Sequence, residues 1–398
     1  MYLSRLLGSA LDRALNGFPA ILITGPRQSG KTTFLIHQAG PDARYVSLDD
    51  PTERSLAQAD PIGFLDRLPE GRVLLDEIQY APELLPPLKI RIDRDRRNNG
   101  RWLLSGSQQF QLMANVSESL AGRIALLELL PFSLQETAPL LRRALAETIW
   151  NGGYPDPVLY PENRDLWLSS YLPTYVERDV RQLHRIQDLR AFETLLGLAA
   201  ARHGQELNLS EFSRTVGLSV PTVKSYLGTL EASYVIRLLP PYFENFGKRL
   251  TKTPKIYFLD SAIACYLTRQ PSAEAALAGA MGGALFEGLI VSEAAKVFAS
   301  LGRPADLYFW RTRDGFEVDL LIRTPTGLAP IEIKLTSTPT PRHVEQMTKF
   351  GQVASAVARP GVLVCTIPEA RPLPGGHVAL PWQEFPSWLW RELGGALT

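Results

Sequence analysis

Cysteine is scarce in this sequence, which has two, Cys265 and Cys365, in 398 residues. They lie far apart, and neither belongs to a CxxC pair or to a Cys/His spacing typical of zinc sites. The five histidines are scattered as well. These absences exclude a recognisable zinc motif and a disulfide-rich secreted scaffold, and they favour a reducing compartment.

An excess of charge of one sign is also missing. Lys and Arg total 42 against 41 Asp and Glu, which leaves a formal net charge of +1. The chain therefore has no overall basic field that would by itself indicate nucleic acid or an anionic membrane as a partner. Any contact with DNA must depend on a local group of residues.

Long hydrophobic runs are absent too. Arg5, Asp12 and Arg13 interrupt the N-terminal segment, so it lacks the apolar core of a signal peptide. The weakly apolar stretch 275–286 is rich in Gly and Ala and ends at Glu287, too short to cross a bilayer. The sequence predicts a soluble cytoplasmic protein, and its 45% hydrophobic residues are enough for two or three domain cores.

What is present is a phosphate-binding loop. Two glycines five positions apart are followed at once by Lys and a hydroxyl residue, in the run Gly25, Pro26, Arg27, Gln28, Ser29, Gly30, Lys31, Thr32 and Thr33. This pattern arises by chance in only about one chain of this length in a hundred. The apolar run 20–24 before it predicts a buried strand, and 31–39 predicts a helix.

Each residue type in the loop has its own chemical role. Gly25 and Gly30 allow the backbone N–H groups to face phosphate oxygens, and the helix that begins at Lys31 adds its positive dipole end. We expect Lys31 to reach the β- and γ-phosphates of a nucleotide and Thr32 to bind Mg²⁺. The sequence therefore predicts a site for ATP and Mg²⁺.

Two acids follow a second buried-strand pattern over 72–77. Asp76 and Glu77 stand at the carboxyl end of this segment, where open α/β sheets bind their ligands. We expect Asp76 to complete the Mg²⁺ site and Glu77 to orient and deprotonate the attacking water. The alternative, two solvated acids at the start of a helix, is weakened by the upstream phosphate loop.

Two further residues are candidates for the same chemistry. After the strand predicted at 101–105, Ser107 is preferred over Gln108 as a sensor of the γ-phosphate. Arg123 precedes the apolar run 124–130 and could act as an arginine finger, within the chain or across a subunit interface. A surface Arg before a strand fits the spacing of Arg123 equally well.

These pieces resemble those of predicted bacterial and archaeal ATPases of the AAA superfamily that carry a conserved C-terminal domain of unknown function. The resemblance extends over nearly the whole chain and includes Gly-Gly-Tyr-Pro at 152–155, Glu-Arg-Asp at 177–179, Trp-Arg-Thr at 310–312 and Glu-Val-Asp at 317–319. It implies an ATP-binding AAA core. Ser107 departs from the Asn that is usual at the sensor position of AAA proteins.

The middle of the chain predicts helices and a winged helix-turn-helix. Apolar residues recur at helical spacing over 167–201, and a helix from Leu209, a turn at 216–218, a second helix from Ser219 and a strand at 234–238 follow. Such a module places exposed residues early in its second helix into the major groove. The residues concerned are Thr222, Lys224 and Ser225, and the basic residues at 248, 249, 252 and 255 are candidates for phosphate contact. A packing or protein-binding surface is the alternative.

A second constellation lies near the C-terminus. Strands predicted at 317–322 and 330–334, with a turn centred on Pro325 and Thr326, place Asp319 opposite Glu332 and Glu317 opposite Lys334 on one face. With Glu287 on a preceding helix, this set resembles the restriction-endonuclease-like pattern. There Asp319, Glu332 and Glu287 would bind Mg²⁺ and Lys334 would activate water. Cross-strand ion pairs on an exposed hairpin are the alternative.

The sequence thus predicts an α/β protein with three domains: a P-loop AAA-type ATPase at 1–150, a helical and winged-helix region at 151–275 and a nuclease-like α/β domain at 276–398. The predicted function is Mg²⁺-dependent ATP hydrolysis coupled to DNA binding or cleavage. The alternative is an ATP-controlled regulatory module that binds a protein and has no nuclease activity. A monomer and an oligomer both remain compatible with the sequence.

Overall fold

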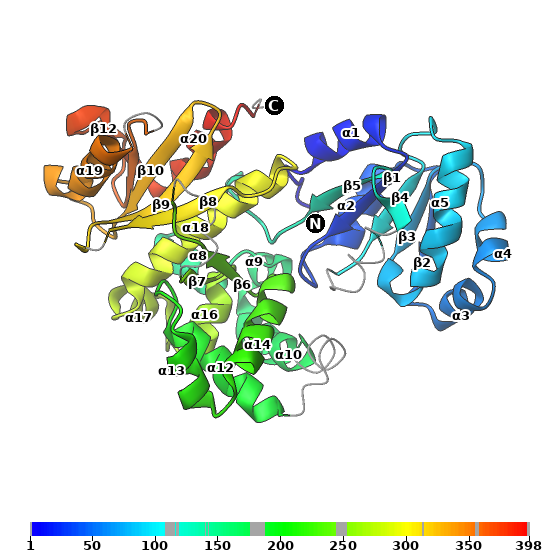
Figure 1. Ribbon diagram of the computed structural model, residues 1–398, viewed down its shortest axis with the longest axis horizontal. Helices are drawn as coiled ribbons and strands as arrows, with labels where there is room; N and C mark the ends of the chain where they lie inside the picture. The colour runs from blue at the N-terminus through cyan, green and yellow to red at the C-terminus, as the bar shows by residue number, and fades with distance from the viewer. Residues whose placement is uncertain are drawn as a thin grey trace. The chain divides into compact units, whose positions relative to one another are not determined.

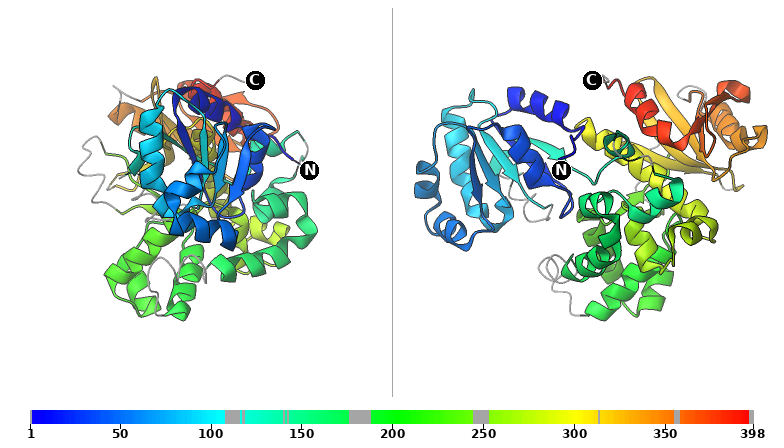
Figure 2. Two further views of the ribbon diagram at one scale, coloured as in Figure 1. Left: turned by 90° about the vertical axis from the view of Figure 1, so that its right-hand side faces the viewer. Right: turned by 180° about the vertical axis from the view of Figure 1, so that it is seen from behind.

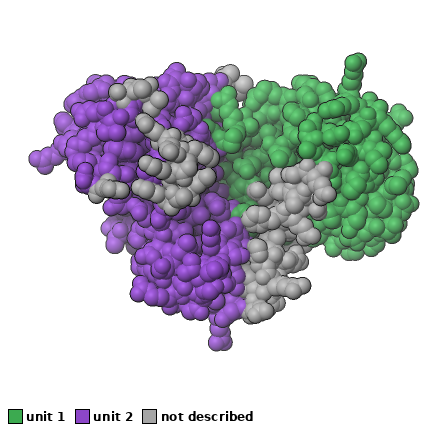
Figure 3. Space-filling view, viewed as in Figure 1, with its two compact units in different colours: residues 1–132, 232–234, 298–304 green, residues 133–231, 235–297, 305–398 purple. Residues whose placement is uncertain are grey.

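A computed structural model describes residues 2–107, 116, 119–139, 141, 143–175, 188–243, 253–312, 314–354 and 358–395. The chain forms two compact units, which are described separately (Figure 3). Unit 1 comprises Met1–Phe132, Ala232–Tyr234 and Phe298–Pro304, and unit 2 comprises Ser133–Glu231, Val235–Val297 and Ala305–Thr398. The main segment of unit 1 therefore ends earlier than the ATPase boundary predicted at residue 150.

Unit 1 contains a five-stranded sheet in the order β2-β3-β4-β1-β5, and every neighbouring pair is parallel. Its strands are β1 (Ala20–Thr24), β2 (Arg44–Ser47), β3 (Val73–Asp76), β4 (Trp102–Ser105) and β5 (Ile124–Glu128). Residues of β1 and β3 are fully buried, as continuous apolar runs in a parallel sheet require. The parallel arrangement brings the carboxyl ends of β1, β3 and β4 to one edge of the sheet.

Helices cover both faces of this sheet (Figure 2). They are α1 (Gly8–Gly17), α2 (Lys31–Ala39), α3 (Pro51–Ala59), α4 (Pro61–Asp66) and α5 (Leu85–Arg94). Because side chains alternate along β1, Ile21 and Ile23 pack in one core with Phe34 of α2, while Ala20 and Leu22 pack in the other with Ile92 of α5.

Unit 2 begins with short helices that lead into a compact helical module (Figure 1). These are α7 (Leu134–Thr137), α8 (Leu145–Asn151), α9 (Pro155–Leu159), α10 (Arg164–Tyr175), α12 (Leu189–Ala201), α13 (Leu209–Val216), α14 (Val220–Ala232), α16 (Ser261–Leu267) and α17 (Ala273–Ala278). The long helical stretch predicted at 167–201 corresponds to α10 and α12. Residues 176–187, with the Glu-Arg-Asp motif, lie outside the described part of the chain.

Strands β6 (Ile236–Leu239) and β7 (Lys255–Phe258) pair antiparallel after α14. The order α13, α14, β6 matches the two helices and the strand predicted for the middle region, although β6 starts two positions after the predicted strand, and β7 was not predicted. Gly217 ends α13 in the left-handed conformation, φ 73°, which explains why a glycine stands at this turn.

The C-terminal part of unit 2 contains a six-stranded mixed sheet in the order β12-β13-β11-β10-β9-β8. Its strands are β8 (Leu307–Arg311), β9 (Glu317–Thr324), β10 (Gly327–Ile333), β11 (Val362–Cys365), β12 (Arg371–Pro372) and β13 (Val378–Pro381). The helices of this part are α18 (Gly282–Ser300), α19 (Glu345–Val353) and α20 (Phe385–Glu392). Short 3-10 helices occupy Ile78–Tyr80, Pro82–Leu84, Pro161–Asn163, Pro341–Val344, Pro374–Gly376 and Trp382–Glu384.

Helix α18 begins within the weakly apolar stretch 275–286 noted in the sequence, whose first residues belong to α17. Neither it nor any other helix in the described residues combines the length and apolarity needed to cross a bilayer.

Candidate functional site

The phosphate-binding loop connects β1 to α2, as the sequence predicts. Gly25 (φ 140°), Gln28 (φ 60°) and Gly30 (φ 90°) have positive φ values, which explains the two glycines. A Cβ atom on Gly25 would lie 2.2 Å from the Leu129 carbonyl oxygen. The loop therefore fits closely against the chain that leaves β5, and only glycine is accommodated at its first position.

Lys31 lies inside the curve of this loop. Its side chain is buried, and its Nζ donates to the carbonyl oxygens of Gly25 at 3.1 Å and Pro26 at 2.8 Å. The hydroxyl of Ser29 is fully buried and has no hydrogen-bond partner among the described residues. A buried polar atom of this kind at the loop indicates a site suited to a polar ligand.

The residues expected to bind Mg²⁺ are adjacent. Thr32, in the first turn of α2, donates its hydroxyl to the Asp76 carboxylate at the end of β3, at 2.9 and 3.1 Å. Tyr45 of β2 donates to the same carboxylate at 3.0 Å, and Ser105 of β4 donates as well. The Thr32 hydroxyl at the start of α2 and the Asp76 carboxylate at the end of β3 are oxygen ligands of the kind that suits Mg²⁺.

The environment of Asp76 also affects Tyr45. Burial and the negative charge of Asp76 together raise the pKa of the Tyr45 hydroxyl. Tyr45 therefore remains a hydrogen-bond donor to Asp76 over the physiological pH range.

Glu77 follows Asp76 in a left-handed conformation, φ 57° and ψ 48°, instead of continuing the strand. Its backbone N donates to Ser105 Oγ at 3.2 Å, and its carboxylate accepts a hydrogen bond from Gln79 Nε2. The same Gln79 nitrogen lies 3.4 Å from Ser107 Oγ. The predicted base and the predicted sensor are thus joined through Gln79, whereas Gln108 lies outside the described residues.

Several residues of this site escaped the sequence-based prediction. Arg5 is buried and donates to the carbonyl oxygens of Ser29 at 3.0 Å and Leu130 at 2.5 Å, so it supports the loop from behind. The others are Tyr45, Ser105 and Gln79. No sequence pattern around Arg5 or Tyr45 indicates a role in the site. Ser105, at the end of a predicted strand, and Gln79, two residues after Glu77, could have been proposed from their positions.

Arg123 lies away from the phosphate loop. Its carbonyl oxygen accepts from Ala20 N, 3.4 Å away, so it stands at the amino end of β1, about 13 Å along the strand from the loop. Its guanidinium binds both carboxylate oxygens of Asp93 in α5, at 2.6 and 3.0 Å, and lowers the pKa of that acid. The structure therefore does not bring Arg123 to the phosphate loop of its own chain.

The C-terminal hairpin has the predicted register. Strands β9 and β10 pair from Gly327 opposite Thr324 to Ile331 opposite Leu320, so the next pair along is Glu332 and Asp319. Lys334 Nζ lies 2.8 Å from Asp319 Oδ2 and 3.0 Å from Glu332 Oε1. These three residues are brought together as the sequence predicts.

Glu317 differs from the prediction that it faces Lys334. It pairs instead with Lys255 of β7 at 2.5 Å and with Arg311 of β8 at 3.6 Å. The register pairing of β9 with β10 ends at Leu320 and Ile331 and does not extend to Glu317 and Lys334, and the Lys334 ammonium contacts Asp319 instead.

Glu287 is on α18, as predicted, but its carboxylate is engaged by other groups. Lys255 Nζ is 3.0 Å away, and the Tyr257 hydroxyl donates to the same oxygen. Among the described residues, no group of three or more His, Cys, Asp or Glu side chains is arranged to hold a metal ion. The three predicted carboxylates therefore do not form a common metal shell in this structure.

Burial and the neighbouring charges shift the pKa values of several groups in this cluster. Burial and the charge of Asp319 raise the pKa of Glu332 to about 8, and its Oε2 atom has no hydrogen-bond partner among the described residues. Burial and Asp319 also raise the pKa of Glu287. Burial alone would lower the pKa of Lys255, but the Glu287 and Glu317 carboxylates raise it.

The position of Lys255 corrects one expectation about DNA contact. This lysine was grouped with the basic residues 248, 249 and 252, yet it is 4% exposed and paired with two acids. It is not available to a phosphate backbone, and the other three residues lie outside the described part of the chain. On α14, Lys224 and Ser225 are exposed and Thr222 is half-buried.

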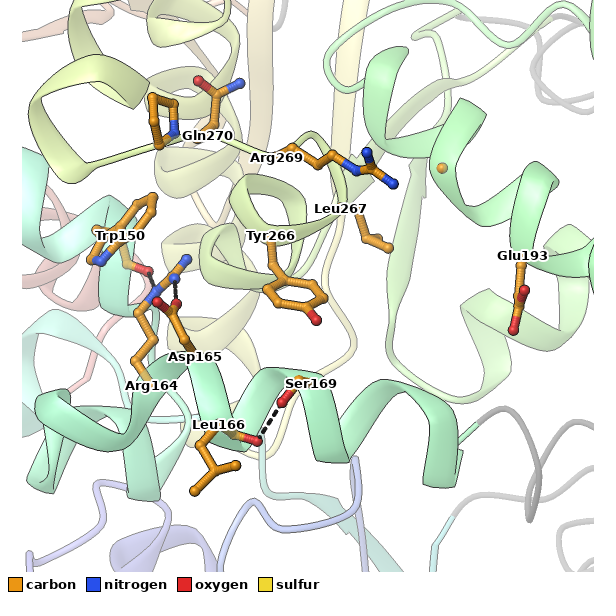
Figure 4. Close-up of a pocket in the computed structure, with 12 residues that line it drawn as sticks. Trp150, Arg164, Asp165, Leu166, Ser169, Glu193, Tyr266, Leu267, Arg269 and Gln270 are labelled. Carbon is orange, nitrogen blue, oxygen red and sulfur yellow. Dashed lines mark hydrogen bonds and ion pairs between the residues drawn. The ribbon is translucent and has the colours of Figure 1, made fainter.

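A separate pocket of about 970 Å³ lies between helices of unit 2 (Figure 4). Trp150 and Tyr266 provide aromatic surface, and Arg269 and Glu193 are exposed at its rim. Arg164 donates to the Trp150 carbonyl oxygen at 2.6 Å and pairs with Asp165. The pocket contains none of the residues that the sequence predicted for function.

Three sequence families match successive parts of the chain. An AAA domain matches residues 17–138, a domain of unknown function (DUF8612) matches 142–274, and another domain of unknown function (DUF4143) matches 282–385. The AAA match covers the phosphate loop, Asp76, Glu77 and Arg123. It supports ATP binding and ATPase activity as the general function of this part of the chain.

Among solved structures, similarity is found to the Walker-type ATPase PABY2304 of Pyrococcus abyssi, with 16% identity over 66% of this chain and 94% of that chain and a TM-score of 0.44. The RuvB Holliday junction branch migration motor of Thermotoga maritima shows 15% identity over 59% of this chain and 89% of that chain, with a TM-score of 0.32.

Closer relatives are known from sequence. The uncharacterized proteins Rv2008c of Mycobacterium tuberculosis and Mb2031c of Mycobacterium bovis are each 33% identical over 334 residues, which is 83% of this chain and 73% of the mycobacterial protein. The chain therefore belongs to the same family as Rv2008c and Mb2031c, and its N-terminal part is an AAA-type ATPase domain.

Proposed function

We propose that the protein hydrolyses ATP with Mg²⁺ held by Thr32 and Asp76. The observation that carries this proposal is the 2.9 Å contact between the Thr32 hydroxyl and the Asp76 carboxylate, beside the buried Lys31. Mg²⁺ needs oxygen ligands next to the β- and γ-phosphates, and these two residues supply them where the loop ends.

Within this proposal the remaining residues have distinct tasks. The backbone N–H groups from Gly25 to Lys31 bind phosphate oxygens, and Lys31 exchanges its two loop carbonyl partners for the β- and γ-phosphates. Glu77 accepts a proton from the attacking water. Gln79 connects Glu77 to Ser107, which gives Ser107 a route to sense the γ-phosphate.

Two substitutions test this assignment. Lys31→Ala should lower ATP affinity at least about 100-fold, whereas Glu77→Gln should bind ATP normally and hydrolyse it roughly 1000-fold more slowly. Equilibrium binding of a fluorescent ATP analogue and steady-state phosphate release separate the two effects. Normal hydrolysis by both variants would refute the assigned roles.

We further propose that the nucleotide state controls the rest of the chain, which comprises one domain at 151–275 and another at 276–398. The order α13, α14, β6, β7 supports a winged helix that binds DNA through Lys224 and Ser225, both exposed on α14. Asp319, Glu332 and Lys334 support a nuclease-like site, because two facing carboxylates would supply oxygen ligands to Mg²⁺ and Lys334, within 3.0 Å of both, would activate water.

The alternative is a regulatory module that ATP controls and that binds a protein partner without cleaving DNA. The pairing of Glu287 and Glu317 with Lys255 favours this alternative, because it places an ammonium group among the acids where a metal ion would bind. Fold similarity to nucleases would not by itself decide the activity.

Cleavage of supercoiled and linear DNA with Mg²⁺ or Mn²⁺, with and without ATP, distinguishes these alternatives. A nuclease under ATP control should lose cleavage in Asp319→Asn and change its ATP response in Lys31→Ala. Intact ATP hydrolysis without any cleavage would favour the regulatory module. In that case, salt-dependent DNA binding that weakens in Lys224→Glu would identify DNA as the partner.

A further inference from the structure

Tyr234 is the last residue of a short segment, Ala232–Tyr234, that belongs to unit 1, whereas the chain before and after this segment belongs to unit 2. It lies in the turn between α14 and β6 and has a φ of 61°, where the sequence predicted the start of a strand. The left-handed conformation costs an L-residue roughly 1–2 kcal/mol, so the surroundings must hold it. The contacts of the Tyr234 side chain explain how this conformation is held.

The Tyr234 hydroxyl bridges two strand ends. It donates to Glu128 Oε1 at 3.1 Å and lies 3.2 Å from Thr24 Oγ1. Thr24 is the last residue of β1, Glu128 is the last residue of β5, and the two are register partners. One phenol group therefore contacts the carboxyl ends of both strands.

These strand ends are next to the phosphate loop. Thr24 directly precedes Gly25, and its carbonyl oxygen accepts from Leu129 N at 2.8 Å. Gly25 packs so closely on the Leu129 carbonyl that a Cβ atom would be 2.2 Å from its oxygen. A shift of Thr24 relative to Glu128 would thus move the first residue of the loop.

The backbone after Tyr234 leads directly into the α14–β6 module. Val235 N donates to Leu230 O of α14 at 2.9 Å, and Val235 O accepts from Leu259 N at 3.0 Å. We propose that Tyr234 is a positioning residue of the ATP site and passes the state of the phosphate loop to α14 and β6. This inference depends on the proposed control by nucleotide state and assigns a residue to it.

Tyr234→Phe removes the hydroxyl and keeps the ring. Loss of about one hydrogen bond should weaken binding of a non-hydrolysable ATP analogue with Mg²⁺ by roughly fivefold. It should also reduce, by at least half, the analogue-dependent change in amide hydrogen exchange across residues 220–239. Tyr226→Phe is the matched control, since Tyr226 is a tyrosine of the neighbouring helix α14 and loses the same hydroxyl group.

A second pair of variants separates positioning from simple packing. Glu128→Gln keeps a carbonyl oxygen that accepts from Tyr234 and should retain most of the exchange response, whereas Glu128→Ala should lose it. If the wild type shows no analogue-dependent exchange in 220–239, control by nucleotide state is itself wrong. If the wild type responds and Tyr234→Phe responds equally, with unchanged affinity, only the role of Tyr234 is refuted.

Discussion

Ser105 shows how one buried hydroxyl can set the geometry of both acids in the ATP site. Its Oγ donates to the Asp76 carboxylate and accepts from Glu77 N at 3.2 Å, and the residue is fully buried. Asp76 ends β3 in the extended conformation, whereas Glu77 turns into the left-handed region. Ser105 fixes this change of direction from the neighbouring strand.

We therefore expect Ser105→Ala to lower kcat for ATP hydrolysis about tenfold and to change KM for ATP less than about threefold. Two hydrogen bonds of about 1 kcal/mol each are lost. The bond from Glu77 N orients the proposed base, so its loss should lower kcat, whereas the bond to Asp76 orients a proposed Mg²⁺ ligand and should account for the smaller change in KM. Steady-state hydrolysis measures both constants. Ser55→Ala, on the exposed surface of α3, serves as control. A wild-type kcat in Ser105→Ala would show that the strand backbone orients Asp76 and Glu77 without the Ser105 hydroxyl.

At the scale of elements, His203 joins three segments of unit 2. It follows α12, its Nδ1 accepts from Phe258 N of β7 at 3.0 Å, and a Cβ atom on Gly288 of α18 would lie 2.0 Å from its Nε2. Burial lowers the pKa of His203 from 6.5 to about 4. The imidazole is therefore neutral in the folded protein at pH values where it is charged in the unfolded chain.

This difference predicts a loss of stability in mild acid. A depressed folded-state pKa means that the unfolded chain binds more protons between pH 6.5 and about 4, so the free energy of unfolding decreases as pH falls through this window. The wild type should lose roughly 2 kcal/mol more than His203→Asn between pH 7 and 4.5. Urea unfolding at both pH values measures the difference, with His37→Asn, exposed on α2, as control. Equal pH slopes in wild type and His203→Asn would contradict the prediction.

At the scale of the whole molecule, Arg123 raises the question of assembly. It is at the amino edge of the unit 1 sheet, paired with Asp93, whereas the phosphate loop is at the carboxyl edge. If Arg123 is an arginine finger, it acts on a neighbouring subunit, and the Asp93 pair must open when that subunit binds ATP.

A mixing experiment tests this role. Arg123→Ala should lower kcat by about 1000-fold, the usual contribution of an arginine finger. An equimolar mixture with Lys31→Ala should regain activity. In mixed oligomers, an Arg123→Ala subunit with an intact phosphate loop lies beside a Lys31→Ala subunit with an intact Arg123. Wild-type activity should also rise with protein concentration. Full activity of Arg123→Ala would show that Arg123 is not an arginine finger. Its role would then be structural, in the ion pair with Asp93.

The sequence by itself determined the local chemistry of this protein. The loop from Gly25 to Thr32, the acids Asp76 and Glu77, and the register that sets Asp319 opposite Glu332 were all predicted, because strand alternation and loop composition are local properties. The family matches confirm the AAA-type ATPase. The residue roles, the winged helix and the nuclease-like site stay predictions.

Only the tertiary structure decided which partners these residues meet. Tyr45, Ser105 and Tyr234 reach the ATP site from segments far away in the sequence, and Lys255 leaves the predicted basic group to pair with Glu287 and Glu317. Arg123 is separated from the loop by the length of β1 because the strands are parallel. Contacts of this kind depend on how strands and helices assemble in three dimensions, and no spacing along the chain records them.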